Sequence, residues 1–151
     1  MAIHNDKEFK AILHSLSIAR QRQVAARFAE NVLSVSTDPR VAGAVHAATR
    51  ADIGDQELAL AFQAVRRATV ESYTQCGKEA DWMCQAGHFV AKAAMSSVMP
   101  AEQGANLAWE AAMNARMARA AETVATGEGT GGNSEAERQY RLLEEFLPQE
   151  G

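Results

Sequence analysis

The stretch from Cys84 to Met99, CQAGHFVAKAAMSSVM, decides the fold. It is rich in alanine, contains no proline, and predicts a helix that its neighbours approach closely. At 100° per residue, its polar side chains and the preceding aspartate form one narrow strip: Asp81, Gln85, His88, Lys92 and Ser96. Gly87, Ala91 and Ala94 lie beside this strip. The pattern therefore predicts the central packing helix of a domain, with one polar edge.

The rest of the chain has a similar composition. Alanine makes up 31 of the 151 residues, and valine and isoleucine do not alternate as they would in strands. We expect an all-α protein: a compact multi-helix bundle of about six to seven helices, mostly antiparallel neighbours, in a single domain over residues 1–151. A stacked array of helix pairs is the lower-ranked alternative, because no exact repeat is present.

Capping residues and helix breakers divide the chain. We expect Asn5, Thr37 or Asp38, Asp55 and Ser134 to cap helices, with Pro39 in a first turn and breaks at Gly77 and Pro100. The helices are predicted at about 5–16, 18–35, 39–51, 56–75, 78–99, 101–125 and 134–147, with a flexible glycine-rich loop near 126–133. Two apolar stripes are expected to face the core. They are Leu58, Phe62, Val65, Thr69, Tyr73 and Cys76, and then Trp109, Met113, Met117, Ala120 and Val124.

The charge is moderate and uneven. The net charge is −4, with +3 in residues 1–50 and −7 in residues 51–151. No dense run of Lys and Arg occurs, which argues against a nucleic-acid partner. No signal peptide is evident and no apolar run of about 18 residues could span a membrane. The two cysteines are too few for a disulfide framework or a four-cysteine zinc site. We therefore expect a cytoplasmic protein with reduced thiols.

Cys84 and His88 form the pair closest to a chemical site. Their i, i+4 spacing can place two ligands on one metal, but a third ligand is not visible nearby and Cys76 does not supply it. The favoured interpretation is a partly hydrated strip on a mostly buried helix. No catalytic residue, cofactor or metal ligand is assigned. An alternative is an enzyme or a small-ligand or metal-binding protein, with a pocket lined by His88, Cys84, Trp82 and Trp109.

The order of three segments resembles a family of bacterial immunity proteins, the immunity-protein-five-like alanine-rich helical domain. The first is RQVAARFAENVLSVSTDPRVAGAVHAA, residues 22–48, with its Asp38-Pro39-Arg40 turn. The second is AGHFVAKAAMSSV, and the third pairs LAWEAAMNARMARAAE with AERQYRLLEEFL. That family often has histidine where this chain has Ala94 and Val98, so His88 inherits no role. The resemblance implies a protein that neutralises a toxin by binding it, without catalysis or a cofactor.

These observations together predict a non-catalytic cytoplasmic binding protein with a protein partner, such as a toxin domain. Its expected partner surface comprises Arg20, Arg27, Asp81, Gln85, His88 and Lys92. Exposed aromatic side chains among Tyr73, Trp82 and Trp109 would serve as anchors, because interfaces favour aromatic and arginine residues. A structural homo-oligomer that joins through the alanine faces stays open as a further alternative.

Overall fold

The computed structural model describes residues 2–76, 81–100, 106–127 and 132–149. Within these ranges the chain forms seven α-helices and one 3₁₀ turn, which confirms the all-α prediction. The elements are α1 (Asp6–Ser15), α2 (Ile18–Glu30), η1 (Leu33–Val35), α3 (Pro39–Thr49), α4 (Asp55–Cys76), α5 (Trp82–Val98), α6 (Leu107–Thr126) and α7 (Gly132–Phe146). The predicted break at Gly77, residues 128–131 of the glycine-rich loop and the predicted helix start at 101 lie outside the described residues.

Local side-chain chemistry starts four of the helices. The side chains of Asn5, Ser17, Asp38 and Asp81 each accept a hydrogen bond from a backbone N–H in the first turn of α1, α2, α3 and α5. Pro39 occupies the first turn of α3, as its fixed φ favours.

Three predicted helix boundaries need correction. The helix predicted for residues 18–35 ends at Glu30, because the chain turns at Asn31, whose carbonyl accepts a hydrogen bond from Arg119 Nη2 at 3.0 Å. Asp55 is the first residue of α4 rather than its cap. The last helix begins at Gly132, so Ser134 lies inside it.

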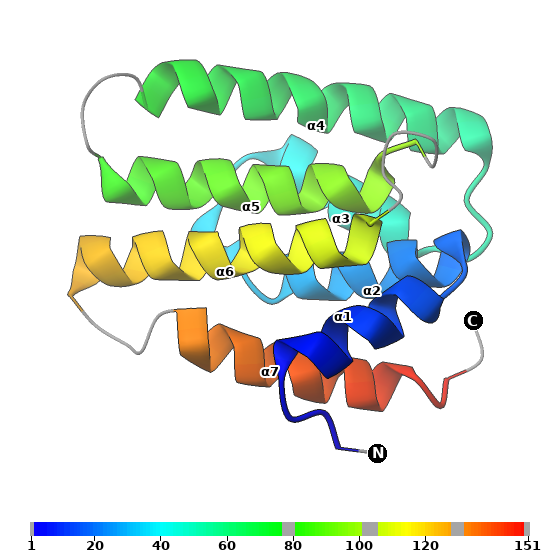
Figure 1. Cartoon of the computed structure of the whole chain (residues 1–151). Helices are drawn as coiled ribbons and strands as arrows, with labels where there is room; N and C mark the ends of the chain where they lie inside the picture. Colours follow the sequence, from blue (N-terminus) through cyan, green and yellow to red (C-terminus); the bar gives the residue numbers. More distant parts are fainter. Residues whose placement is uncertain (1, 77–80, 101–105, 128–131, 150–151) are drawn as a thin grey trace.

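The helices pack as a compact bundle. Figure 1 shows α4, α5, α6 and α7 one below the other, with α2 and α3 behind them. One buried cluster joins α2, α3, α4, α5 and the second half of α6. A second joins α1, α2, α7 and the first half of α6 around Phe9 and Phe28. The contacts among α2, α5 and α6 make these three helices the centre of the domain, as predicted for α5.

The predicted core stripe of α6 is only half right. Trp109 and Met113 are partly buried and pack against a core cluster, but Met117 is 50% exposed and Val124 is 57% exposed. The face that is buried consists of one leucine and six alanines: Leu107, Ala108, Ala111, Ala112, Ala115, Ala118 and Ala121. Alanine lets the axes of α5 and α6 approach closely, so contact between backbones and small side chains replaces burial of large ones.

The outer helix α4 also differs from its predicted core stripe, at one residue. Val65, Thr69 and Cys76 are buried as the apolar stripe predicts, but Tyr73 is 73% exposed. Few of the residues of α4 are buried, since it packs chiefly against α3 and α5. Its C-terminal half forms one wall of the groove described below.

Polar side chains tie α7 to the bundle. Glu135 is 3% exposed and accepts hydrogen bonds from Arg119 Nε at 3.2 Å and from the side-chain amide of Asn31 at 2.5 Å. The amide of the fully buried Gln139 donates to the carbonyl of Ala112 at 2.9 Å and accepts from Arg116 Nε at 2.8 Å. Buried polar groups are tolerated where their hydrogen bonds are made, and these contacts fix the orientation of α7.

Candidate functional site

An open groove of about 770 Å³ lies between the start of α3, the end of α4 and the first half of α5. The segment from Val35 to Val41 supplies one wall. Ala68, Ser72 and Gln75 from α4 supply another, and α5 supplies the rest, including Met83, Cys84, Gly87, His88 and Ala91. The groove therefore brings the Asp38-Pro39-Arg40 turn next to the polar strip of α5, two features that are distant in the sequence. Gly87 and Ala91 also line the groove, and neither carries a side chain larger than a methyl group.

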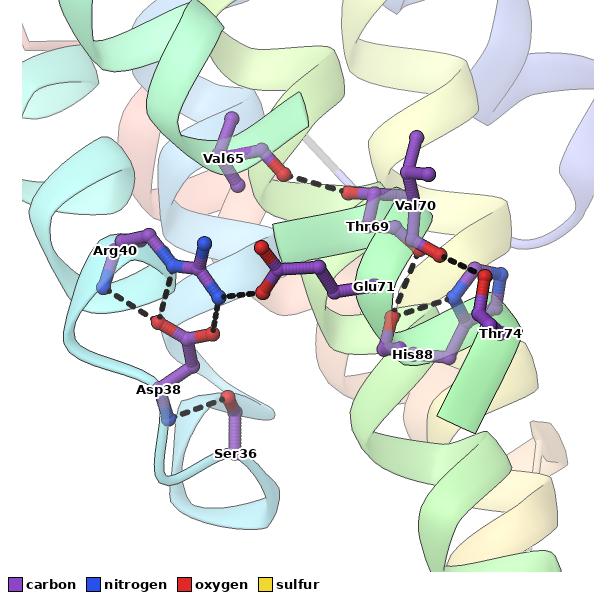
Figure 2. A network of polar contacts seen from close by, with 10 residues as sticks. Ser36, Asp38, Arg40, Val65, Thr69, Val70, Glu71, Thr74 and His88 are labelled. Carbon is purple, nitrogen blue, oxygen red and sulfur yellow. Dashed lines mark hydrogen bonds and ion pairs between the residues drawn. The ribbon is translucent and has the colours of Figure 1, made fainter. Parts of the chain in front are cut away.

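One arginine joins two walls of the groove. Arg40 Nη2 lies 2.8 Å from Asp38 Oδ2 and 2.6 Å from Glu71 Oε2, so it links α3 to α4 (Figure 2). The hydrogen bonds from Arg40 lower the pKa of both carboxyl groups below their ordinary values, and the two carboxylates raise the pKa of Arg40. All three groups are charged at neutral pH. Arg40 is thus a structural clamp with its charge already balanced.

His88 lies on the opposite side of the groove from this clamp, held against α4. The Ser72 hydroxyl donates to the carbonyl of Thr69 at 2.9 Å, and its oxygen lies 2.8 Å from His88 Nδ1. We assign the proton to Nδ1, because the serine proton is directed to Thr69, which leaves Nε2 as the acceptor nitrogen. Burial, and then the nearby charge of Lys92, lower the pKa of His88 below its ordinary value. The imidazole is therefore uncharged at neutral pH.

The two cysteines form a disulfide, which differs from the expectation of reduced thiols. Cys76 ends α4 and Cys84 lies in the first turn of α5, with 5.6 Å between their Cα atoms. That separation is within the range a disulfide requires. The eight-residue spacing gives no sign of the pairing, because the pairing depends on α4 and α5 being adjacent antiparallel helices.

Apolar side chains are exposed at the same end of α4 and α5. Tyr73 is 73% exposed, and Trp82 and Met83 are each 43% exposed. The disulfide keeps them near one another, because Tyr73 lies three residues before Cys76 and Trp82 and Met83 directly precede Cys84. The ring of Tyr73 lies 5.8 Å from that of His88. We call Tyr73, Trp82 and Met83 the rim: Met83 lines the groove, and Tyr73 contacts His88, which also lines it.

The predicted partner surface divides into two separate places. Asp81 and His88 line the groove, and Gln85 and Lys92 are partly buried on the same helix, α5. Arg20 and Arg27 lie elsewhere, in a second hollow of about 520 Å³ beside Phe146. There Arg20 donates to the carbonyls of Phe146 and Leu147 at the end of α7, and Arg27 donates to Gln149 Oε1 at 2.9 Å.

The pocket predicted from Trp82, Cys84, His88 and Trp109 needs correction, because only two of these residues line the groove. His88 and Cys84 line the groove, but Trp82 is 43% exposed and does not line it, and Trp109 packs in the other cluster, 6.2 Å from the ring of Phe9. The residue that the sequence interpretation missed is Ser72, which orients His88. Its position three residues after Thr69 and sixteen before His88 gives no local signal.

The chain was compared with the patterns of metal sites, membrane helices and known proteins. Among residues 2–76, 81–100, 106–127 and 132–149, no three His, Cys, Asp or Glu side chains are grouped as metal ligands would be. Over the same part of the chain, no helix combines the length and the hydropathy needed to cross a membrane. Comparison with protein-family models, with characterised proteins and with solved structures gives no match.

Proposed function

We propose that this is a non-catalytic helical binding protein of the cytoplasm, which neutralises a toxin domain by binding it as immunity proteins do. The observation that carries the proposal is the exposure of Tyr73, Trp82 and Met83 at the joined ends of α4 and α5, with Met83 lining the groove. Aromatic residues and methionine are enriched at protein interfaces, and aromatic anchors supply much of the binding energy. The resemblance of the segment order to immunity proteins gives the class of partner.

The groove and its rim suit a protein partner in shape and charge. Asp38 and Arg40 line the groove and Glu71 contacts Arg40 from α4, so the clamp carries one positive and two negative charges. Asp81 adds another negative charge at the start of α5. A partner that inserts a basic side chain into the groove, while apolar groups cover the rim, would match this distribution.

The experiment begins with the neighbouring gene, which the proposal expects to encode a toxin domain, and continues with a growth assay in cells that produce that domain. We expect co-expression of the wild-type protein to restore growth, and the double variant Tyr73→Ala/Trp82→Ala to fail while keeping its fold by circular dichroism. The matched control is Val124→Ala, which removes an exposed apolar side chain from α6 and should still protect. Protection by the double variant equal to that of the wild type, or no complex between the purified wild type and the toxin domain, refutes the proposal.

A further inference from the structure

The two halves of the disulfide occupy unequal environments. Cys84 lines the groove and is partly exposed, whereas Cys76 is 8% exposed. Cys84 lies in the first turn of α5, where its backbone N–H donates to Asp81 Oδ1 at 3.1 Å. Cys76 is the last residue of α4. The more exposed cysteine is therefore at a helix N-terminus, and the buried one is at a helix C-terminus.

This difference has a direct chemical consequence. The partial positive charge of a helix N-terminus stabilises a thiolate, and the partial negative charge of a C-terminus destabilises it. After reduction, the helix dipoles therefore favour the thiolate on Cys84 over that on Cys76, while the Asp81 carboxylate beside Cys84 acts against this preference. Cys84 is also the cysteine that lines the groove, where a substrate can reach it. Exposure and the helix dipole select the same residue as the reactive one.

We propose that Cys76 and Cys84 form a reversible dithiol–disulfide site, in which Cys84 exchanges with small peptide disulfides and Cys76 resolves the mixed disulfide. In the reduced protein, the Cys84 thiolate attacks one sulfur of the substrate, and the other half leaves as a thiolate that takes up a proton. The Cys76 sulfur loses its proton and attacks Cys84, which releases the second half as a thiol. The substrate disulfide is reduced and the protein dithiol is oxidised; an external dithiol reverses the change.

The groove gives the substrate class. Its volume of about 770 Å³ lies within the range of small-molecule sites, which suits a peptide-sized disulfide. The side chains of Thr37 and Gln75 also line the groove and offer polar partners to peptide groups. One further argument rests on the proposed cytoplasmic location: disulfides in that compartment are generally transient and take part in redox chemistry.

The test uses oxidised glutathione as the probe and intact-mass measurement as the readout. We expect the folded Cys76→Ser variant to gain one glutathione on Cys84 and the folded Cys84→Ser variant to stay unmodified. Reduced wild-type protein should return to the internal disulfide and release both halves of the probe as thiols. Equal modification of the two variants, or of neither, overturns the proposal.

A second measurement covers the case in which a serine variant does not fold. Reduced wild-type protein is treated with a limiting amount of iodoacetamide, and peptide mapping locates the label. We expect Cys84 to react about tenfold faster than Cys76 or more, because thiolate formation and exposure both favour it. Equal labelling refutes the assignment, as does an oxidised protein that dithiothreitol reduces only when urea unfolds it. Neither measurement involves a toxin, so this proposal and the proposed function can fail independently.

Discussion

Replacing Ala115 by leucine tests whether α6 packs through its alanine face. Ala115 is fully buried and belongs to the cluster shared by α2, α3, α4 and α5. Leucine adds three carbon atoms at a position with no open surface, so neighbouring side chains or a helix axis must shift. Overpacking of this kind costs about 1–3 kcal/mol of folding free energy. For a domain of this size, about 2–4 °C of melting temperature accompanies each kcal/mol, which gives a drop of about 2–12 °C.

The assay is thermal unfolding followed by circular dichroism, and the matched control is Ala125→Leu. Ala125 is exposed on the same helix, so the same substitution there should change the free energy of unfolding by no more than about 0.5 kcal/mol. If the two variants melt at the same temperature, the alanine face has room for larger side chains. The argument for close approach of α5 and α6 would then be wrong.

Three further predictions concern the polar contacts and the disulfide. Glu135→Gln removes a buried charge that accepts a hydrogen bond from Arg119, so it should lower the free energy of unfolding, measured in urea, by about 1–3 kcal/mol. The control Glu137→Gln is at an exposed position and should have almost no effect; equal effects of the two variants would refute the buried ion pair. The pKa of His88 is lower in the folded protein, so the unfolded chain binds a proton first as the pH falls below about 6.5, and the free energy of unfolding should decrease there. His88→Gln should reduce the slope of the free energy of unfolding against pH. An unchanged slope would contradict the burial of the imidazole. Reducing the disulfide that joins Cys76 and Cys84 should lower the stability by about 2.5 kcal/mol, the loop-closure value for an eight-residue separation, and an unchanged urea midpoint would show that no crosslink forms.

The helices were predictable because their signals are local. Asn5, Asp38 and Pro39 act within one turn of the residues they affect, and the alanine content favours helix at each position independently. The inward face of α6 was not predictable in the same way. Hydrophobicity ranks Met117 and Val124 above Ala115 for burial, but the closeness of two helix axes reverses that order. Axis separation is a property of a helix pair, so one helix alone cannot reveal it.

The groove, too, could be predicted from the sequence only in part. Helical spacing of 100° per residue predicts Asp81 and His88 in one polar strip, and both line the groove. The other wall comes from Asp38 and Arg40, which lie more than forty residues earlier in the chain. The pairing of Cys76 with Cys84 depends on how α4 meets α5 rather than on cysteine spacing. Thus the sequence indicated one wall of the groove, while tertiary packing supplies the rest.

The proposed docking rim and the proposed redox site share an edge of the bundle where little is buried. α4 packs chiefly against α3 and α5, and beyond Thr69 its only buried residue is Cys76. Besides the disulfide, the Ser72–His88 hydrogen bond and the packing of Tyr73 on His88 hold the C-terminal half of α4 against α5. Local opening costs least where few apolar contacts are lost. Reduction would therefore loosen the segment that carries Tyr73, so the arrangement of the rim depends on the oxidation state of Cys76 and Cys84.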